Sequence, residues 1–366
     1  MFVTYPERPV VIPGVNLPGV AENAASAGWI LNQLTPGPGG LPADVAKTLI
    51  LTGRLPAQYL TGPCPPSCTA GAALIDPHSR TPYAEHASFQ LDREIGKGLV
   101  LGLSYLFVAA HHQVRAENLN VSPPAGLLSD GKQFFSGPLY SNAGLLYYTD
   151  DSGNAVYHGA TAQVSQRLGQ WLRFNANFTF SKTLDDGTFT TFVSTPQDVY
   201  ERNLERANSN QDVRERFVSS FTFDGPASTI LRKFQLSGIV TLQSGRPFTL
   251  FVGYDANGDT NPVTDRVGQS ARNTYYGDKL LSADLRLSRY FALKERSRLT
   301  VAVDAFNALN RANVDEVNSV YGYADFLGPV PQHYGDGVGR PANPLFGAPR
   351  TMLNPRWIQI SMRLAF

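Results

Sequence analysis

The last ten residues of the chain follow a two-residue alternation of apolar and polar side chains. The even positions from 358 to 366 are all apolar, whereas positions 359, 361 and 363 carry Gln, Ser and Arg. Successive side chains of a β-strand point to opposite faces, so this alternation predicts a strand with one apolar face and one polar face.

The same two-residue pattern recurs upstream. It is clear at 171–182, 281–291 and 299–309, and weaker at 87–95, 99–108, 156–168, 213–224 and 234–244. Together with the C-terminal segment this gives about nine strands of about 9–13 residues, close to the roughly 9–11 residues that a tilted strand needs to cross a bilayer. The sequence therefore predicts strands long enough to span a membrane.

Short and long connections alternate between these segments. The links at 96–98, 169–170 and 293–296 are short, whereas those at roughly 112–155, 183–212, 245–277 and 310–355 are long and rich in Gly, Pro, Asn and Asp. Repeated structureless loops of this length are uncommon in compact soluble domains. Outer-membrane barrels instead combine short periplasmic turns with long extracellular loops. We therefore predict an all-β fold: part of an antiparallel transmembrane β-barrel with about nine long strands.

Composition excludes several classes of function. A formal net charge of +1 with 17% charged residues argues against a nucleic-acid partner, which requires a clustered basic surface. No apolar run approaches the roughly 18 residues of a membrane helix. The sequence carries no G-x-S-x-G, H-E-x-x-H or phosphate-binding glycine motif, so it does not indicate an enzyme.

Residues 1–80 are predicted to be a mostly irregular extracellular segment and residues 81–366 the barrel segment. The apolar run at 45–51 does not alternate and predicts a short helix with Asp44 near its N-cap; a hidden strand is the alternative. Cys64 and Cys68 either form a small disulfide loop or remain free thiols. The odd strand number, the external start of the first strand and the absence of a signal peptide at the N-terminus suggest a fragment of a larger barrel.

Several segments between Thr81 and Phe366 resemble the C-terminal barrel of Oar-like TonB-dependent transporters of the acidobacterial type. The resembling segments are Thr81–His86 with Leu91–Ile95, Tyr157–Ala160, Phe178–Asp185, Asp212–Val218, Ser244–Phe248, Asp304–Asn310 and the terminal Phe366. The resemblance implies a 22-stranded barrel with an internal plug and a carboxypeptidase-regulatory-like module in a Gram-negative outer membrane. It also implies energy supplied by the TonB complex through an N-terminal box. The plug, the module and the box are not recognisable in this sequence, so TonB is expected as a partner only if that part exists.

One connection carries a candidate metal site. Asp255, Asn257, Asp259 and Asp265 offer hard oxygen ligands at spacings that resemble a calcium loop. The EF-hand pattern is incomplete, because Gly258 stands fourth rather than sixth and no late Glu follows. The alternative is an Asx- and Gly-rich turn that binds no ion.

A second set of candidates lies on the polar faces of the strands and is expected to face the barrel lumen: Arg173, Asp284, Arg286, Asp304 and Arg363. The arginines either line a substrate path or pair with the aspartates.

The leading interpretation is an outer-membrane receptor or transporter barrel, with lipid around it, that takes up a large or scarce substrate of unknown identity. A truncated barrel with a structural or adhesive role is the first alternative. A secreted soluble β-sandwich that binds carbohydrate is the second, and it requires the apolar strand faces to pack against one another in a dry core.

Overall fold

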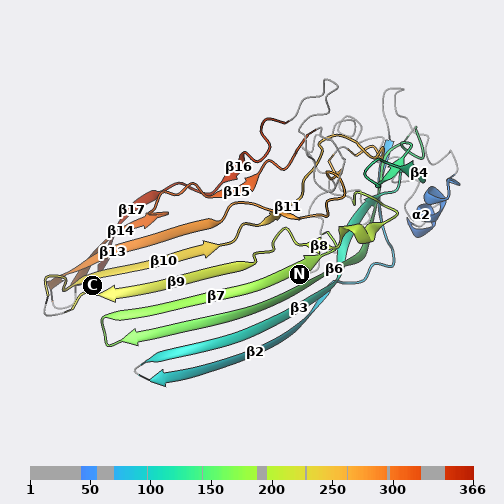
Figure 1. Cartoon of the computed structure of the whole chain (residues 1–366). Helices are drawn as coiled ribbons and strands as arrows, with labels where there is room; N and C mark the ends of the chain where they lie inside the picture. The colour runs from blue at the N-terminus through green and yellow to red at the C-terminus, as the bar shows by residue number, and fades with distance from the viewer. Residues whose placement is uncertain are drawn as a thin grey trace.

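We describe the protein from a computed structural model, which covers residues 43–55, 70–96, 98–141, 143–187, 196–226, 229–261, 263–294, 297–322 and 343–366. Nine long antiparallel strands form one curved, single-layered sheet in the order β17-β14-β13-β10-β9-β7-β6-β3-β2 (Figure 1). Their bounds are β2 Tyr83–Gly96, β3 Leu99–Asn118, β6 Ala143–Leu168, β7 Leu172–Asp185, β9 Glu215–Asp224, β10 Phe234–Gln243, β13 Leu280–Lys294, β14 Ser297–Phe306 and β17 Trp357–Ala365. The predicted nine-stranded antiparallel fold is confirmed.

Neighbouring strands of this sheet are also neighbours in sequence, so each pair is joined by a direct connection. The short turns lie at the end of the sheet where the chain terminates, and the long connections gather at the opposite end (Figure 1). Two small strands extend the same sheet: β1 Ala70–Ile75 runs parallel to β6, and β8 Ala207–Asn208 pairs with β7. Among the described residues, no helix combines the length and hydrophobicity needed to cross a bilayer.

The register sorts side chains into apolar and polar rows on opposite faces of the sheet. Directly opposed residues of antiparallel strands point to the same face. One apolar row consists of Phe174, Phe221, Gly238, Leu285, Ala305 and Ile358. The adjacent row, on the other face, is polar and consists of Arg173, Thr222, Ser237, Arg286, Asp304 and Gln359.

Large apolar side chains on the apolar face remain exposed rather than packed. On β17, Ile358 is 58% exposed, Ile360 68% and Leu364 55%. The soluble sandwich would bury these residues against a second layer, and among the described residues no such layer covers them. The main sheet therefore does not have the dry interior that this alternative requires.

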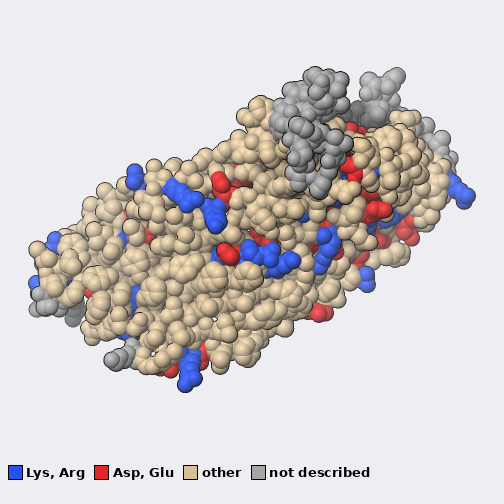
Figure 2. Space-filling view, in the orientation of Figure 1, with Lys and Arg blue, Asp and Glu red and all other residues tan. Residues whose placement is uncertain are grey.

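The long connections form a compact structure, which we call the loop body. It comprises the described residues of 119–141, 196–214, 244–279, 307–322 and 343–356 and contains three small two-stranded sheets and a short 3-10 helix. These are β4 Pro124–Leu127 with β5 Gln133–Phe135, β11 Pro247–Phe248 with β12 Tyr275–Tyr276, β15 Val314–Val317 with β16 Pro349–Met352, and η2 Arg202–Glu205. Charged side chains gather at this end of the molecule, whereas the sheet surface in view is mostly uncharged (Figure 2).

Two buried hydrophobic clusters lie at this end of the molecule. One joins the helix α2 Ala43–Leu51 to β1 and β6 through Ile50, Leu74 and Leu146. The other consists of Leu250, Val252 and Val267 inside the connection between β10 and β13. The short helix predicted at 45–51 is confirmed, with Asp44 in its first turn. The predicted choice between a disulfide and free thiols at Cys64 and Cys68 falls outside the described residues.

The prediction was wrong about the length of two strands. β3 continues to Asn118 and β6 begins at Ala143, so much of the expected loop at 112–155 is strand. Consecutive residues of this extension, Arg115 to Asn118, are all buried because the loop body and α2 cover both faces. Two buried faces remove the alternation of polarity on which the strand prediction depends.

Candidate functional site

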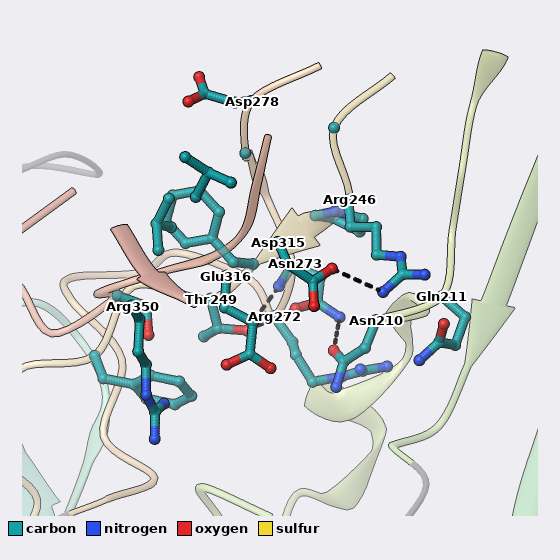
Figure 3. Close-up of a pocket in the computed structure, with 18 of the residues that line it drawn as sticks. Asn210, Gln211, Arg246, Thr249, Arg272, Asn273, Asp278, Asp315, Glu316 and Arg350 are labelled. Carbon is teal, nitrogen blue, oxygen red and sulfur yellow. Dashed lines mark hydrogen bonds and ion pairs between the residues drawn. The ribbon is translucent and has the colours of Figure 1, made fainter. Parts of the chain in front are cut away.

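A cavity of about 600 Å³ opens among the long connections. Side chains from three connections line it, as Figure 3 shows: Asn210, Gln211, Arg246, Thr249, Arg272, Asn273, Asp278, Asp315, Glu316 and Arg350. These ten side chains are polar, with three cations and three anions, and apolar residues such as Phe248, Phe251 and Leu280 also line the cavity. The cavity therefore suits a ligand that has many hydrogen-bonding groups together with some apolar surface.

Buried ion pairs hold two of the lining arginines. Arg266 Nη1 donates to both carboxylate oxygens of Glu205, at 2.9 and 3.0 Å. Arg272 bonds to Asp185 at the end of β7, and its Nε lies 3.9 Å from Glu205 Oε2. A buried charge requires such partners, because an unpaired charge in a dry environment is strongly destabilising. These pairs join η2, β7 and the β10–β13 connection at one wall of the cavity.

Hydrogen bonds between neutral side chains shape the adjoining wall. Thr249 Oγ1 donates to Asn273 Oδ1 at 3.0 Å, and Asn273 N donates back to Thr249 Oγ1 at 2.9 Å. Asn273 also donates to Asn210, which brings the β7–β9 connection alongside (Figure 3). Near the solvent, Arg246 lies 3.6 Å from Asp315 and both side chains are half-exposed. The inner walls are thus fixed by buried bonds, whereas Arg246 and Asp315 remain accessible.

A second feature lies in the same β10–β13 connection, where three carboxylates converge. One carboxylate oxygen from each of Asp255, Asp259 and Asp265 lies within 4.8 Å of the other two. Asp259 and Asp265 are buried, whereas Asp255 is exposed. Thus three of the four residues predicted to ligate calcium are brought together.

The fourth predicted residue, Asn257, braces this cluster. Its Oδ1 accepts a hydrogen bond from Asp259 N at 2.9 Å, and its Nδ2 donates to Gln197 O at 3.0 Å. The adjacent Gly258 has a φ of +82°, and a Cβ at this position would lie 2.1 Å from Phe135 O. Only glycine fits both the conformation and the space, so the sharp turn at Gly258 brings Asp255 and Asp259 together.

Burial perturbs the acids of this cluster. Loss of solvent, reinforced by the charge of Asp265, raises the pKa of Asp259 to about 8. Burial likewise raises the pKa of Asp265 to about 6, although backbone donors at Ala256 and Asn257 oppose the shift. Ionising all three carboxylates at this distance is unfavourable in free energy in a site with little water. The cluster therefore holds a proton at neutral pH unless a cation replaces it.

The five residues predicted to face the lumen all lie on the polar face. Arg286 bonds to both oxygens of Asp304, at 3.0 and 3.1 Å, and Asp284 accepts from Asn307 N at 2.8 Å. Arg173 pairs with Asp224 at 2.9 Å rather than with either predicted aspartate. Arg363 lies on this face opposite Thr300. Their shared face is established by the register, and their position in a lumen stays a prediction.

The comparison with protein families decides the class of this chain. A family model described as "Outer membrane beta barrel domain" matches residues 23–267 and 259–359. The chain belongs to this family. It is therefore an outer-membrane β-barrel protein, and the long antiparallel strands and exposed apolar face of the sheet agree with this assignment.

Solved structures similar to this barrel domain include outer-membrane transporters and receptors. The outer membrane transporter YddB from Escherichia coli is 13% identical, with a TM-score of 0.46, over 81% of this chain and 34% of that one. A mutant of the ferric enterobactin receptor PfeA from Pseudomonas aeruginosa is 16% identical, with a TM-score of 0.45, over 80% and 32%. The FrpB iron transporter from Neisseria meningitidis is 14% identical, with a TM-score of 0.40, over 66% and 29%. The chain spans about a third of the length of these structures. No curated protein matches the sequence.

Sequence reasoning missed the buried network of Glu205, Arg266 and Arg272. Arg266 and Arg272 lie 61 and 67 positions after Glu205 in the sequence, and no local motif links them to it. Arg246 belongs to the Ser244–Phe248 segment that carries part of the family resemblance. Because Arg246 lines the cavity, the resemblance of this segment was a signal in the sequence that pointed towards the site.

Proposed function

We propose that this protein is part of a TonB-dependent outer-membrane receptor or transporter that captures a polar substrate in the cavity of its loop body. The observation that carries the proposal is the combination of a membrane-spanning sheet with a built cavity among the long connections at one end of it. A barrel with a purely structural role has no need of a polar cavity whose walls are fixed by buried ion pairs.

The two faces of the sheet support an orientation in the bilayer. In an outer-membrane barrel the apolar face contacts lipid and the polar face lines the interior. By this rule the row that contains Arg173, Arg286 and Asp304 faces the lumen, where water or a plug contacts it. The cavity then lies above the lumen on the extracellular side, since the long connections of such barrels face outwards.

The sheet edges support a larger barrel. Among the described strands, β2 and β17 end the main sheet and do not pair with each other. Unpaired backbone groups at an edge are costly in lipid, because no water is available to bond them. We infer that further strands lie between β17 and β2 and close the barrel.

Ligand capture followed by uptake tests the proposal. The whole protein would be purified from its host after growth on complex medium, and co-purified small molecules would be identified by mass spectrometry. A double variant, Arg246→Ala with Arg350→Ala, removes two lining cations from the cavity and is expected to lose most of the ligand. Arg93→Ala on β2, far from the cavity, serves as the matched control.

Energy dependence separates transport from adhesion. A labelled form of the captured ligand is expected to enter cells that carry a TonB homologue and to stay at the surface of cells that lack it. Equal entry in both strains would contradict TonB dependence. Surface binding without entry in either strain would instead assign the adhesive role.

A further inference from the structure

We propose that Asp255, Asp259 and Asp265 bind one calcium ion, which fixes the β10–β13 connection against its neighbours. The inference goes beyond transport and does not depend on it, because metal binding can be measured without any substrate. It rests on the spacing of the three carboxylates, on an unsatisfied buried oxygen and on the position of the cluster beside the cavity.

The spacing fits a single ion of calcium size. Calcium ligands lie about 2.4 Å from the ion, so two ligands of the same ion are at most about 4.8 Å apart. The three carboxylate oxygens lie within 4.8 Å of one another. The cluster contains no His or Cys, and a set of hard oxygen ligands selects a hard cation rather than zinc. Three carboxylates and water can complete a shell of six ligands.

An unsatisfied oxygen in this cluster is the second observation. Asp265 is fully buried. Its Oδ2 accepts hydrogen bonds from Ala256 N and Asn257 N, at 2.6 and 3.4 Å, but its Oδ1 has no hydrogen-bond partner among the described residues. A buried polar atom without a partner is rare in native proteins and commonly marks an ion or water site. The Asp265 side chain also belongs to the converging set, so this oxygen has a role if a cation is bound there.

Among the described residues, the cation that acts on this cluster also bonds to groups outside it. Lys132 is the cation whose charge acts on Asp265. Its ammonium lies 3.0 Å from Asp130 Oδ2, so its charge is already paired, and it also donates to Arg266 O at 2.5 Å. A divalent ion would offset the repulsion among the three converging carboxylates, as ion binding to acidic loops generally does.

The position of the cluster gives the ion a consequence for the cavity. Thr264 and Arg266, the two neighbours of Asp265, both line the cavity. On the other side, Asn257 O accepts a hydrogen bond from Phe135 N at 2.6 Å, which joins this connection to the β3–β6 connection. An ion held by Asp255, Asp259 and Asp265 therefore fixes both the contact between the two connections and one wall of the cavity.

Calcium titration of the purified full chain tests the proposal. The protein would be freed of metal with EGTA and titrated calorimetrically with CaCl2, and separately with MgCl2. We expect a calcium dissociation constant of about 10⁻⁴ to 10⁻³ M, as in extracellular calcium modules, and weaker magnesium binding. Asp259→Asn keeps an Oδ1 that can accept from Asn261 N, and it is expected to weaken calcium binding at least tenfold. Glu201→Gln, an exposed change in the same loop body and outside the cluster, is the control.

Proteolysis of the unmodified protein provides a measurement that needs no variant. At free calcium ten times its dissociation constant, trypsin cleavage at Arg266 and Arg272 through local opening is expected to slow about tenfold relative to EGTA. No calcium binding below about 10 mM, tighter binding of magnesium, or unchanged affinity in Asp259→Asn would overturn the proposal. If Asp259→Asn fails to assemble, Asp255→Asn and the proteolysis result decide the question.

Discussion

A charge placed on the apolar face of β17 should destabilise the barrel far more than the same charge one residue away. Ile360 lies on the apolar face and is 68% exposed. Gln359 lies on the polar face, directly opposite Asp304 of β14. Ile360→Arg and Gln359→Arg therefore introduce the same side chain on the same strand, into lipid in the first case and beside a carboxylate in the second.

The position of Ile360 along the strand sets the magnitude. β17 runs from Trp357 to Ala365, so Ile360 lies one residue from its midpoint at Ser361. A strand rises about 3.4 Å per residue and is tilted by roughly 45°, which places Ile360 about 2.4 Å from the bilayer centre if the strand is centred there. Arginine on the lipid face near the midplane costs about 2–4 kcal/mol, or roughly 30- to 900-fold in the folding equilibrium. For Gln359→Arg we expect less than about 1 kcal/mol.

The assay is denaturant unfolding of the whole protein assembled in phosphatidylcholine vesicles. The free energy of unfolding would be obtained from tryptophan fluorescence, and folding would be checked by heat-dependent mobility in gels. An equal or larger loss for Gln359→Arg would show that the faces are assigned the wrong way round. A loss below about 1 kcal/mol for both variants would show that β17 does not cross the bilayer at this depth.

Three further outcomes are expected in the loop body. Gly258→Ala should lower the stability of the loop body by at least about 1–2 kcal/mol, because alanine is strained at a φ of +82°. Faster tryptic cleavage of the loop body would report this loss, and an unchanged cleavage rate would contradict the prediction. Arg266→Met should destabilise the loop body by up to about 3–5 kcal/mol, because buried Glu205 loses its two-bond partner and keeps only the longer contact with Arg272. Glu205→Gln in the same chain should recover part of that loss in hydrogen exchange. Without metal, the stability of the loop body should fall as pH rises from about 4 to about 8. Folding raises the pKa of Asp259 to about 8, so the folded state binds one more proton than the unfolded state in that window. Saturating calcium should remove this slope, and a metal-free stability that rises over the window would refute the assignment.

The strands were predictable wherever one face of the sheet is apolar and the other is polar. β17 alternates in polarity from Ile358 to Leu364 and β7 from Leu172 to Ser181, because each face meets a single environment. The ends of β3 and β6 were not predictable, since Arg115 and Glu117 are covered on both sides by other segments. The parallel pairing of β1 with β6 was also missed, because it depends on helix α2 packing across both strands.

The candidate site divides in the same way. Asp255, Asp259 and Asp265 lie within eleven residues of one another, so a local pattern of acids and a glycine turn was enough to single them out. The pairs of Arg266 and Arg272 with Glu205 join connections that are distant in sequence. The spacing of residues along the chain does not indicate which loops come together. Local chemistry can thus be inferred from sequence, whereas the cavity required the three-dimensional arrangement of three connections.

The two hydrophobic clusters at the loop end have a consequence for how this protein melts. The strands are held by ladder hydrogen bonds that lipid shields from solvent, whereas the clusters around Ile50 and Val252 are buried from water by the protein alone. Urea and heat act on such water-driven packing directly and reach backbone groups inside a bilayer only with difficulty. The loop end can therefore loosen and re-form while the strands stay in the membrane, which gives one polypeptide two separate melting events.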